Sequence, residues 1–305
     1  MQRDPLFDES PRRTLTVQSK GNVMTRPRVI RYGDIDKRFP ERDPDSRKYA
    51  FKVLAEGDSW FTLGGVPSSN LLFNLEMTKP TAVVTIAEPG DTIMHMGDPG
   101  RMLQLRRLLA DPRFAYKWDA ILISGGGNDL IESAPHLLKK FDSASTDPAD
   151  YFDPAALDLL VATVQGAYGA IVAVRDADTS QSKGKPIYVH TYDYPTPRDS
   201  SARFLGAGVL GPWLYPAFLL ADIPETMWIA VSDYLLNRLA EAILALDSQT
   251  GSRPLASVFV VDTRNTLSRA RLGTVGSDGD WANEIHPNTT GYRKIAAKLT
   301  ARINL

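Results

Sequence analysis

The chain has 305 residues, of which 43% are hydrophobic and 23% are charged, a balance typical of a globular protein with a sizeable buried core. Its 35 basic and 36 acidic residues give a formal net charge of −1, so no overall field attracts nucleic acid or an anionic membrane. The lack of cysteine excludes disulfides, thiolate chemistry and cysteine-based zinc sites.

Residues 1–48 are rich in Arg, Asp and Pro, and they begin without the apolar segment of a secretory signal peptide. A cytoplasmic location is therefore the default expectation, with export by a signal-less route as the alternative. We interpret 1–48 as an arm packed on the domain, because Val29, Ile30 and Tyr32 need a buried environment. The other interpretation is a partly disordered leader. The remainder, 49–305, is expected to be one domain.

Short runs of apolar and β-branched residues predict five strands along this domain. They are residues 51–55, 81–87, 119–124, 187–190 and 258–262. Segments with helical periodicity separate them, most clearly at 101–110, 157–175, 229–246 and 292–303. Strands that alternate with helices predict an α/β fold in which helices cover both faces of a parallel sheet.

One region, 198–225, interrupts this alternation. Its apolar core at 203–220 contains several Gly and Pro residues, which argues against a membrane-spanning helix. We expect an insertion that forms a cap or pocket wall, with Phe204, Trp213, Tyr215 and Phe218 as an apolar binding surface. A core-packing insertion without a role in ligand binding is the alternative.

Distinctive residues follow the first three predicted strands. Ser59 lies in the turn after the first, Gly90 follows the second, and Asn128 follows the third. In open parallel sheets, ligands bind at the carboxyl ends of the strands. A serine in this position can attack a substrate if a base activates it, and neighbouring N–H groups can stabilise the resulting oxyanion.

The base should be one of four histidines. His286 lies in a polar loop before the last helix, from which it can reach across the sheet to Ser59. His190 ends the fourth strand and is expected to line the pocket, together with Trp60 and Trp213. No two histidines have metal-ligand spacing, so neither a metal site nor a cofactor is expected.

Four ordered blocks resemble the SGNH hydrolases, also called GDSL-type esterases and lipases. The blocks are Gly57-Asp58-Ser59-Trp60, Gly90, Gly126-Gly127-Asn128-Asp129 and His286-Pro287, and the resemblance covers about residues 50–303. It implies a three-layer α/β/α sandwich, flavodoxin-like, with a five-stranded parallel sheet. It also implies that Ser59 is the nucleophile and that His286 is the general base and then the general acid. The oxyanion hole would comprise the N–H groups of Ser59 and Gly90 and the amide of Asn128.

The chain departs from the family pattern behind the histidine. The family has Asp three residues before it, and this chain has Asn283. The Asn283 Oδ1 atom could accept the Nδ1–H of His286, or the loop could bring Asp280 to that nitrogen. A backbone carbonyl serving a Ser–His dyad is the third option.

These features predict a serine ester hydrolase that forms an acyl-serine intermediate on a small-molecule ester with an apolar acyl or aryl part. Acyl transfer to an alcohol and O-deacetylation of a carbohydrate are alternatives at the same site. The missing Asp motivates a further alternative, a catalytically silent binding module on the same fold. Nucleotide binding at Gly125–Gly127 is disfavoured, because neither a P-loop nor a G-x-G-x-x-G pattern is present.

Overall fold

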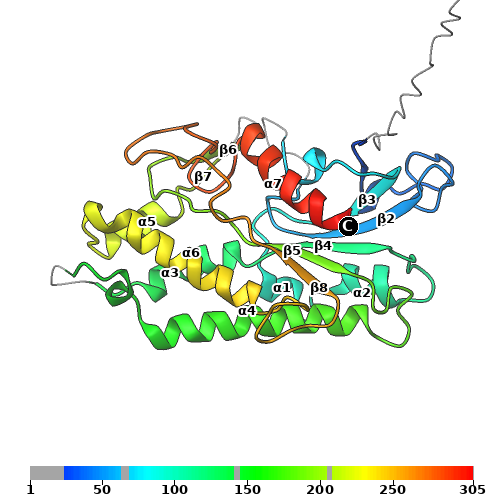
Figure 1. Ribbon diagram of the computed structural model, residues 1–305, viewed down its shortest axis with the longest axis horizontal. Coiled ribbons are helices and arrows are strands. Elements are labelled where there is room, and N and C mark those ends of the chain that lie inside the picture. The colour runs from blue at the N-terminus through cyan, green and yellow to red at the C-terminus, as the bar shows by residue number, and fades with distance from the viewer. Residues whose placement is uncertain (1–23, 63–68, 141–144, 205–207, 305) are drawn as a thin grey trace, which may run out of the picture.

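Six parallel strands form the central sheet, which a computed structural model describes together with the rest of residues 24–62, 69–140, 145–204 and 208–304 (Figure 1). The strands are β1 (Arg28–Arg31), β2 (Phe51–Gly57), β3 (Thr81–Thr85), β4 (Ala120–Ser124), β5 (Ile187–His190) and β8 (Val258–Val261). Their order across the sheet is β1-β3-β2-β4-β5-β8, and every neighbouring pair is parallel. The predicted α/β fold with a parallel sheet is confirmed.

The sheet has six strands, so the expected number of five is wrong. The additional strand is β1, which comes from the predicted arm and pairs with β3 at the edge of the sheet. Its Ile30 is buried. The strand has four residues with Arg at both ends, which leaves only two apolar residues to signal it. Residues 1–23 of the predicted arm lie outside the described part of the chain.

Helices cover both faces of the sheet. They are α1 (Ile93–Met96), α2 (Leu103–Ala110), α3 (Gly127–Leu137), α4 (Pro154–Arg175), α5 (Leu214–Leu220), α6 (Trp228–Leu244) and α7 (Thr289–Ile303). Figure 1 shows α7 on one face and α1, α2, α4 and α6 on the other. The result is the three-layer arrangement that βαβ units produce when they cover a parallel sheet on both sides.

Helix α4 is long and apolar enough, by length and composition alone, to cross a membrane. The buried central helix of a globular protein passes the same test. In this fold α4 packs against α1, α2, α3 and α6. These contacts bury part of its apolar surface against the neighbouring helices.

The predicted insertion contains a small antiparallel hairpin and a short helix. The hairpin consists of β6 (Ala202–Phe204) and β7 (Gly208–Leu210), and α5 follows it. In α5, Leu214 and Phe218 are fully buried, while Leu219 and Leu220 are exposed. The side chain of Phe204 lies outside the described residues. The insertion therefore contributes both core packing and, through Leu214, a wall of the pocket described below.

Candidate active site

A tight turn presents Ser59 at the carboxyl end of β2. The Asp58 carboxylate accepts the N–H of Trp60 at 3.0 Å, and the Asp58 carbonyl accepts the N–H of Phe61 at 3.1 Å. Gly57 allows this turn to lie close to β4, since a Cβ atom at Gly57 would be 2.8 Å from the Cβ of Ser124. The geometry leaves the side chain of Ser59 partly exposed at the end of a rigid strand.

His286 meets Ser59 across the end of the sheet. Its Nε2 atom lies 2.8 Å from Ser59 Oγ, although the two residues are far apart in sequence. The loop that carries His286 is closed by backbone hydrogen bonds, including one from Ala282 N–H to the His286 carbonyl at 2.8 Å. Next to it, the Asn288 side chain caps α7 by accepting the N–H of Gly291 at 3.0 Å.

Asn283 contacts the other ring nitrogen of His286. Its Oδ1 atom lies 3.0 Å from Nδ1 of the ring and also accepts the backbone N–H groups of Ile285 at 3.1 Å and His286 at 2.9 Å. Two N–H donors can be satisfied only by oxygen, which fixes the orientation of the Asn283 amide. The ring proton of the neutral imidazole therefore belongs on Nδ1, and the lone pair of Nε2 faces the Ser59 hydroxyl and can accept its proton.

Asp280, the other residue expected to orient His286, is occupied elsewhere. Its carboxylate accepts the backbone N–H of Ser268 at 2.6 Å and forms an ion pair with Lys294 on α7. These partners lower the pKa of Asp280, with Lys294 the main favourable contact opposing the effect of burial. The carboxylate thus fastens the loop to α7, and the interpretation of Asp280 as the orienting group is wrong.

The imidazole of His286 is enclosed by neighbouring side chains. The indole of Trp213 packs edge-on against it, with ring centroids 5.4 Å apart. Burial lowers the pKa of His286 from 6.5 to about 4, because its surroundings disfavour the charged imidazolium. The ring is consequently neutral, and able to accept a proton, over most of the physiological pH range.

Asn128 and Gly90 lie on the two segments that flank the Ser59 turn. Asn128 is in the first turn of α3 and shares a pocket with Ser59, and its side-chain amide donates to the Asp91 carbonyl at 2.8 Å. Gly90 has a positive φ of 79° in the turn after β3. Within the described part of the chain, the backbone N–H groups of Ser59 and Gly90 donate to no protein acceptor. Gly90 itself is not among the residues that line the pocket.

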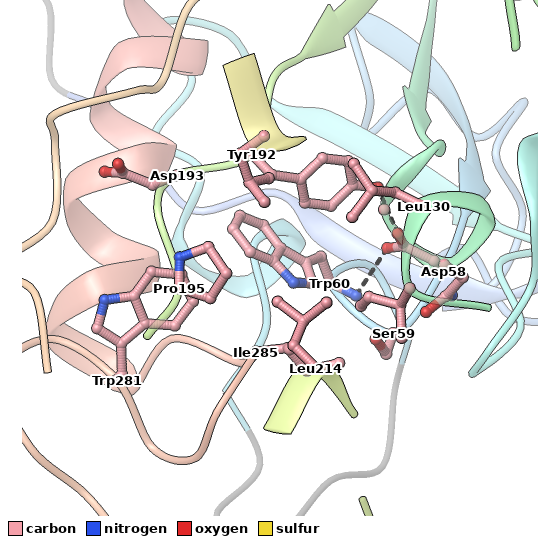
Figure 2. Close-up of a pocket in the computed structure, with 14 residues that line it drawn as sticks. Asp58, Ser59, Trp60, Leu130, Tyr192, Asp193, Pro195, Leu214, Trp281 and Ile285 are labelled. Carbon is pink, nitrogen blue, oxygen red and sulfur yellow. Dashed lines mark hydrogen bonds between the residues drawn. The ribbon is translucent and has the colours of Figure 1, made fainter. Parts of the chain in front are cut away.

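A mainly apolar pocket opens beside Ser59 (Figure 2). In the figure, Trp60, Ile285 and Leu214 lie next to Ser59, while Pro195 and Trp281 lie farther along. The remaining lining residues are Asp58, Gly127, Asn128, Leu130, Ile131, Tyr192, Asp193 and Leu236. The cavity measures about 30 Å³, far below the roughly 150 Å³ of an engineered apolar cavity that binds benzene. The enclosed space beside Ser59 is therefore small and mainly apolar.

Of the three residues expected to bind substrate, only Trp60 lines this pocket. Trp213 instead covers the ring of His286. Leu214, Ile285 and Trp281 also line the pocket, and none of them was predicted from the sequence to bind substrate. Trp281 and Ile285 both precede His286 in the same loop, so their nearness in sequence to a candidate base was the one available signal.

His190 belongs to a second Ser–His–Asp set that is completely buried. Its Nε2 atom lies 3.0 Å from Ser124 Oγ, and that hydroxyl donates to the Asp58 carboxylate at 2.8 Å. The Asp58 carboxylate also receives the hydroxyl of Tyr192. Ser124 and His190 are both 0% exposed, so no substrate can reach the Ser124 hydroxyl. The expectation that His190 lines the substrate pocket is wrong, and the set supports the Ser59 turn from below.

Burial shapes the proton affinities of this second set. It lowers the pKa of His190 to about 4 and raises that of Asp58 to about 6, although the Tyr192 hydroxyl opposes the latter shift. The Nδ1 atom of His190 faces the Thr191 carbonyl at 2.7 Å rather than a carboxylate. The imidazole thus has a neutral acceptor behind it, as His286 does, and it is the complete burial of Ser124 that keeps this set from attacking a substrate.

The chain matches the sequence model of a known family, described as GDSL-like Lipase/Acylhydrolase, over residues 65–299. The matched region contains Gly90, Asn128 and His286 but begins after Ser59. No curated protein matches the chain.

Solved structures with a related arrangement share little sequence with this chain. A carbohydrate esterase family 3 protein from Talaromyces cellulolyticus is 10% identical, with 83% of this chain and 96% of that chain covered and a TM-score of 0.40. A carbohydrate acetylesterase from Sinorhizobium meliloti is 12% identical, with 83% of this chain and 98% of that chain covered and a TM-score of 0.40. The aryl esterase of M. smegmatis is 16% identical, with 84% of this chain and 100% of that chain covered and a TM-score of 0.35. At these scores the substrates of the three proteins do not transfer to this chain.

Proposed function

We propose, given that the chain belongs to the GDSL-like Lipase/Acylhydrolase family, that it is a carboxylic ester hydrolase with Ser59 as the nucleophile. The observation that carries the proposal is the 2.8 Å contact between Ser59 Oγ and His286 Nε2. A serine hydroxyl is a weak nucleophile, and a hydrogen-bonded imidazole with a free lone pair activates it. Both Ser59 and Ser124 contact an imidazole nitrogen, but only the partly exposed Ser59 can be reached by a substrate.

In the acylation step, Ser59 Oγ attacks the ester carbonyl carbon and its proton passes to Nε2 of His286. The carbonyl oxygen becomes an oxyanion, for which the N–H groups of Ser59 and Gly90 and the amide of Asn128 are the proposed donors. The imidazolium then protonates the leaving alcohol as the C–O bond breaks. Water, deprotonated by the same imidazole, releases the carboxylic acid from Ser59 and regenerates the hydroxyl.

The shape of the pocket favours a short acyl group. Leu214, Ile285 and Trp60 surround apolar space next to Ser59, and the cavity of about 30 Å³ is too small for a benzene-sized ring. An acetyl or propionyl group therefore suits the pocket, while the alcohol part of the ester extends away from it. O-Deacetylation of an acetylated small molecule, such as a carbohydrate, is compatible with the same site.

A series of p-nitrophenyl esters tests this proposal. We expect hydrolysis by the wild-type protein to be fastest for acetate or propionate and to fall as the acyl chain lengthens, and we expect no enzymatic turnover from Ser59→Ala. A fluorophosphonate probe should label Ser59 in the wild-type protein. If the wild-type protein is no faster than Ser59→Ala and the probe does not react, the silent binding module becomes the better interpretation.

A further inference from the structure

The turn that carries Gly90 connects β3 to α1 beside the Ser59 turn. At its start, the N–H of Glu88 donates to the Gly57 carbonyl at 2.9 Å, which joins this segment to the end of β2. Gly90 then adopts a left-handed conformation that favours glycine. Its N–H meets no acceptor among the described residues. The direction of this N–H depends on what holds the rest of the turn in place.

Two neighbouring side chains of α3 hold that turn. The Asn128 amide donates to the Asp91 carbonyl at 2.8 Å. The Asp129 carboxylate accepts the N–H of Ile93 at 2.7 Å through Oδ2 and the N–H of Met94 at 3.1 Å through Oδ1. Asp129 is 2% exposed, so water does not compete for these contacts. The segment from Asp91 to Met94 is therefore fastened to α3 at both of its ends.

This arrangement links two of the proposed oxyanion donors to each other. One hydrogen of the Asn128 amide is engaged by the Asp91 carbonyl, which fixes the amide plane and leaves the second hydrogen available. Gly90, whose N–H is the other donor, is the residue directly before Asp91. If the start of α1 shifts, both donors shift with it.

We propose that Asp129 is a positioning residue that fixes the geometry of the oxyanion hole by holding the start of α1 against α3. The inference rests on the proposed function of Ser59 as the nucleophile. Asp129 touches no reacting atom. It acts through the backbone of Ile93 and Met94, and a buried carboxylate that accepts two backbone N–H groups holds them more firmly than a neutral acceptor does.

The inference predicts a specific kinetic signature for Asp129→Asn. This substitution keeps the size of the side chain but replaces one acceptor oxygen with an NH₂ group, which faces a backbone N–H. Removal of a whole oxyanion donor typically lowers kcat by about 10²–10³, and a displaced donor should lower it by about 10- to 100-fold. Because the oxyanion forms only after substrate binds, KM for p-nitrophenyl acetate should stay within about twofold.

A double-mutant cycle with Asn128→Ala separates positioning from a general loss of stability. If Asp129 acts through the oxyanion hole, the decreases in kcat caused by Asp129→Asn and Asn128→Ala should not multiply in the double variant. Asp129→Glu keeps the charge but moves the carboxylate by one methylene group, and it should also lower kcat. Independent, multiplicative effects, or an unchanged kcat in either Asp129 variant, would overturn the inference.

Asp247→Asn is a matched control for burial and backbone bonding. The Asp247 carboxylate is also buried and accepts backbone N–H groups, from Gln249 at 2.9 Å and Val260 at 2.8 Å, but it lies beyond α6. It should lower the melting temperature with kcat unchanged. Wild-type protein and Ser59→Ala are assayed alongside. An inactive wild-type protein would refute the proposed function, whereas an active one with a fully active Asp129→Asn would refute only the positioning role.

Discussion

The Oδ1 atom of Asn283 lies 3.0 Å from Nδ1 of His286 and is fixed there by the backbone N–H groups of Ile285 and His286 itself. A neutral side chain can thus select the histidine tautomer that activates Ser59. It cannot supply the negative charge that stabilises an imidazolium. The site has the orientation expected of an SGNH hydrolase, but the charge behind the base is missing.

Asn283→Asp should therefore raise both the pKa of His286 and the turnover. A carboxylate can accept the same three N–H groups, so the loop should keep its conformation, and the charge stabilises the imidazolium that forms during acylation. In a serine protease template the opposite change costs about 10⁴ in kcat, partly through a wrong tautomer. Because the tautomer is already correct here, we expect a smaller gain of about tenfold, measured as kcat on p-nitrophenyl acetate at pH 8.

Two further variants control that experiment. Asn283→Ala removes the acceptor and should lower kcat by releasing the ring. The double variant Ser59→Ala with Asn283→Asp should be inactive, which shows that the gain is expressed through Ser59. If Asn283→Asp leaves both kcat and its pH dependence unchanged, Asn283 does not orient the base.

The pH dependence of kcat/KM should reflect the partly buried position of His286. The base must be neutral, so activity rises with pH through the pKa of His286, which burial lowers to about 4. We expect a midpoint near pH 4 and little change between about pH 6 and 8. A midpoint near 6.5, the ordinary value for histidine, would show that the ring is well solvated in the free enzyme. In Asn283→Asp the midpoint should move to higher pH.

The two Ser–His sets should respond differently to loss of their hydroxyls. Ser59→Ala should abolish turnover without lowering stability, because its side chain is partly exposed. Ser124→Ala should keep most of the activity but lower the free energy of unfolding by about 1–3 kcal/mol, since it removes one hydrogen-bond partner from each of the buried side chains His190 and Asp58. Chemical denaturation and p-nitrophenyl acetate hydrolysis measure the two effects. Complete inactivity of folded Ser124→Ala would contradict the assignment of Ser59.

Leu214→Ala should extend the range of acyl chains that the enzyme accepts. Leu214 lines the pocket from α5 and is fully buried, so its truncation opens apolar space beside Ser59. We expect the ratio of kcat/KM for butyrate over acetate to increase by about 10-fold, the order of one or two buried methylene groups. Leu219→Ala, on the exposed side of the same helix, is the control and should leave the ratio unchanged. An unaltered ratio in Leu214→Ala would place the acyl group elsewhere.

The sequence predicted those parts of the fold that depend on local pattern. The five predicted strands consist of apolar, β-branched runs, and all five are found in the sheet. Strand β1 has only Val29 and Ile30 between two arginines, which is too short a run to show an alternating pattern. The meeting of Ser59 with His286 was expected because Ser59 follows a strand end at the ligand-binding edge of the sheet and the loop before the last helix can reach across that edge.

The details of the site depend on loop geometry that residue order does not reveal. Asp280 and Asn283 both lie close enough to His286 in the sequence for either side chain to contact its ring. Lys294, one turn into α7, decides the question by binding Asp280. Likewise, His190 ends a strand at the correct edge, but its side chain faces Ser124 beneath the Ser59 turn rather than the pocket. Which side of a strand end faces the substrate is set by the packing of the neighbouring strands.

The loop that carries His286 and the insertion that carries Leu214 are joined by two buried side chains. Glu284 accepts the N–H groups of Leu214 at 3.1 Å and Tyr215 at 2.7 Å, and the Arg198 guanidinium donates to the Asn283 carbonyl at 2.7 Å. The orientation of His286 and the shape of the pocket therefore depend on the same contacts between the loop and the insertion. A chimaera that exchanges the insertion between members of this family should fold around an intact site only if the histidine loop is transplanted with it.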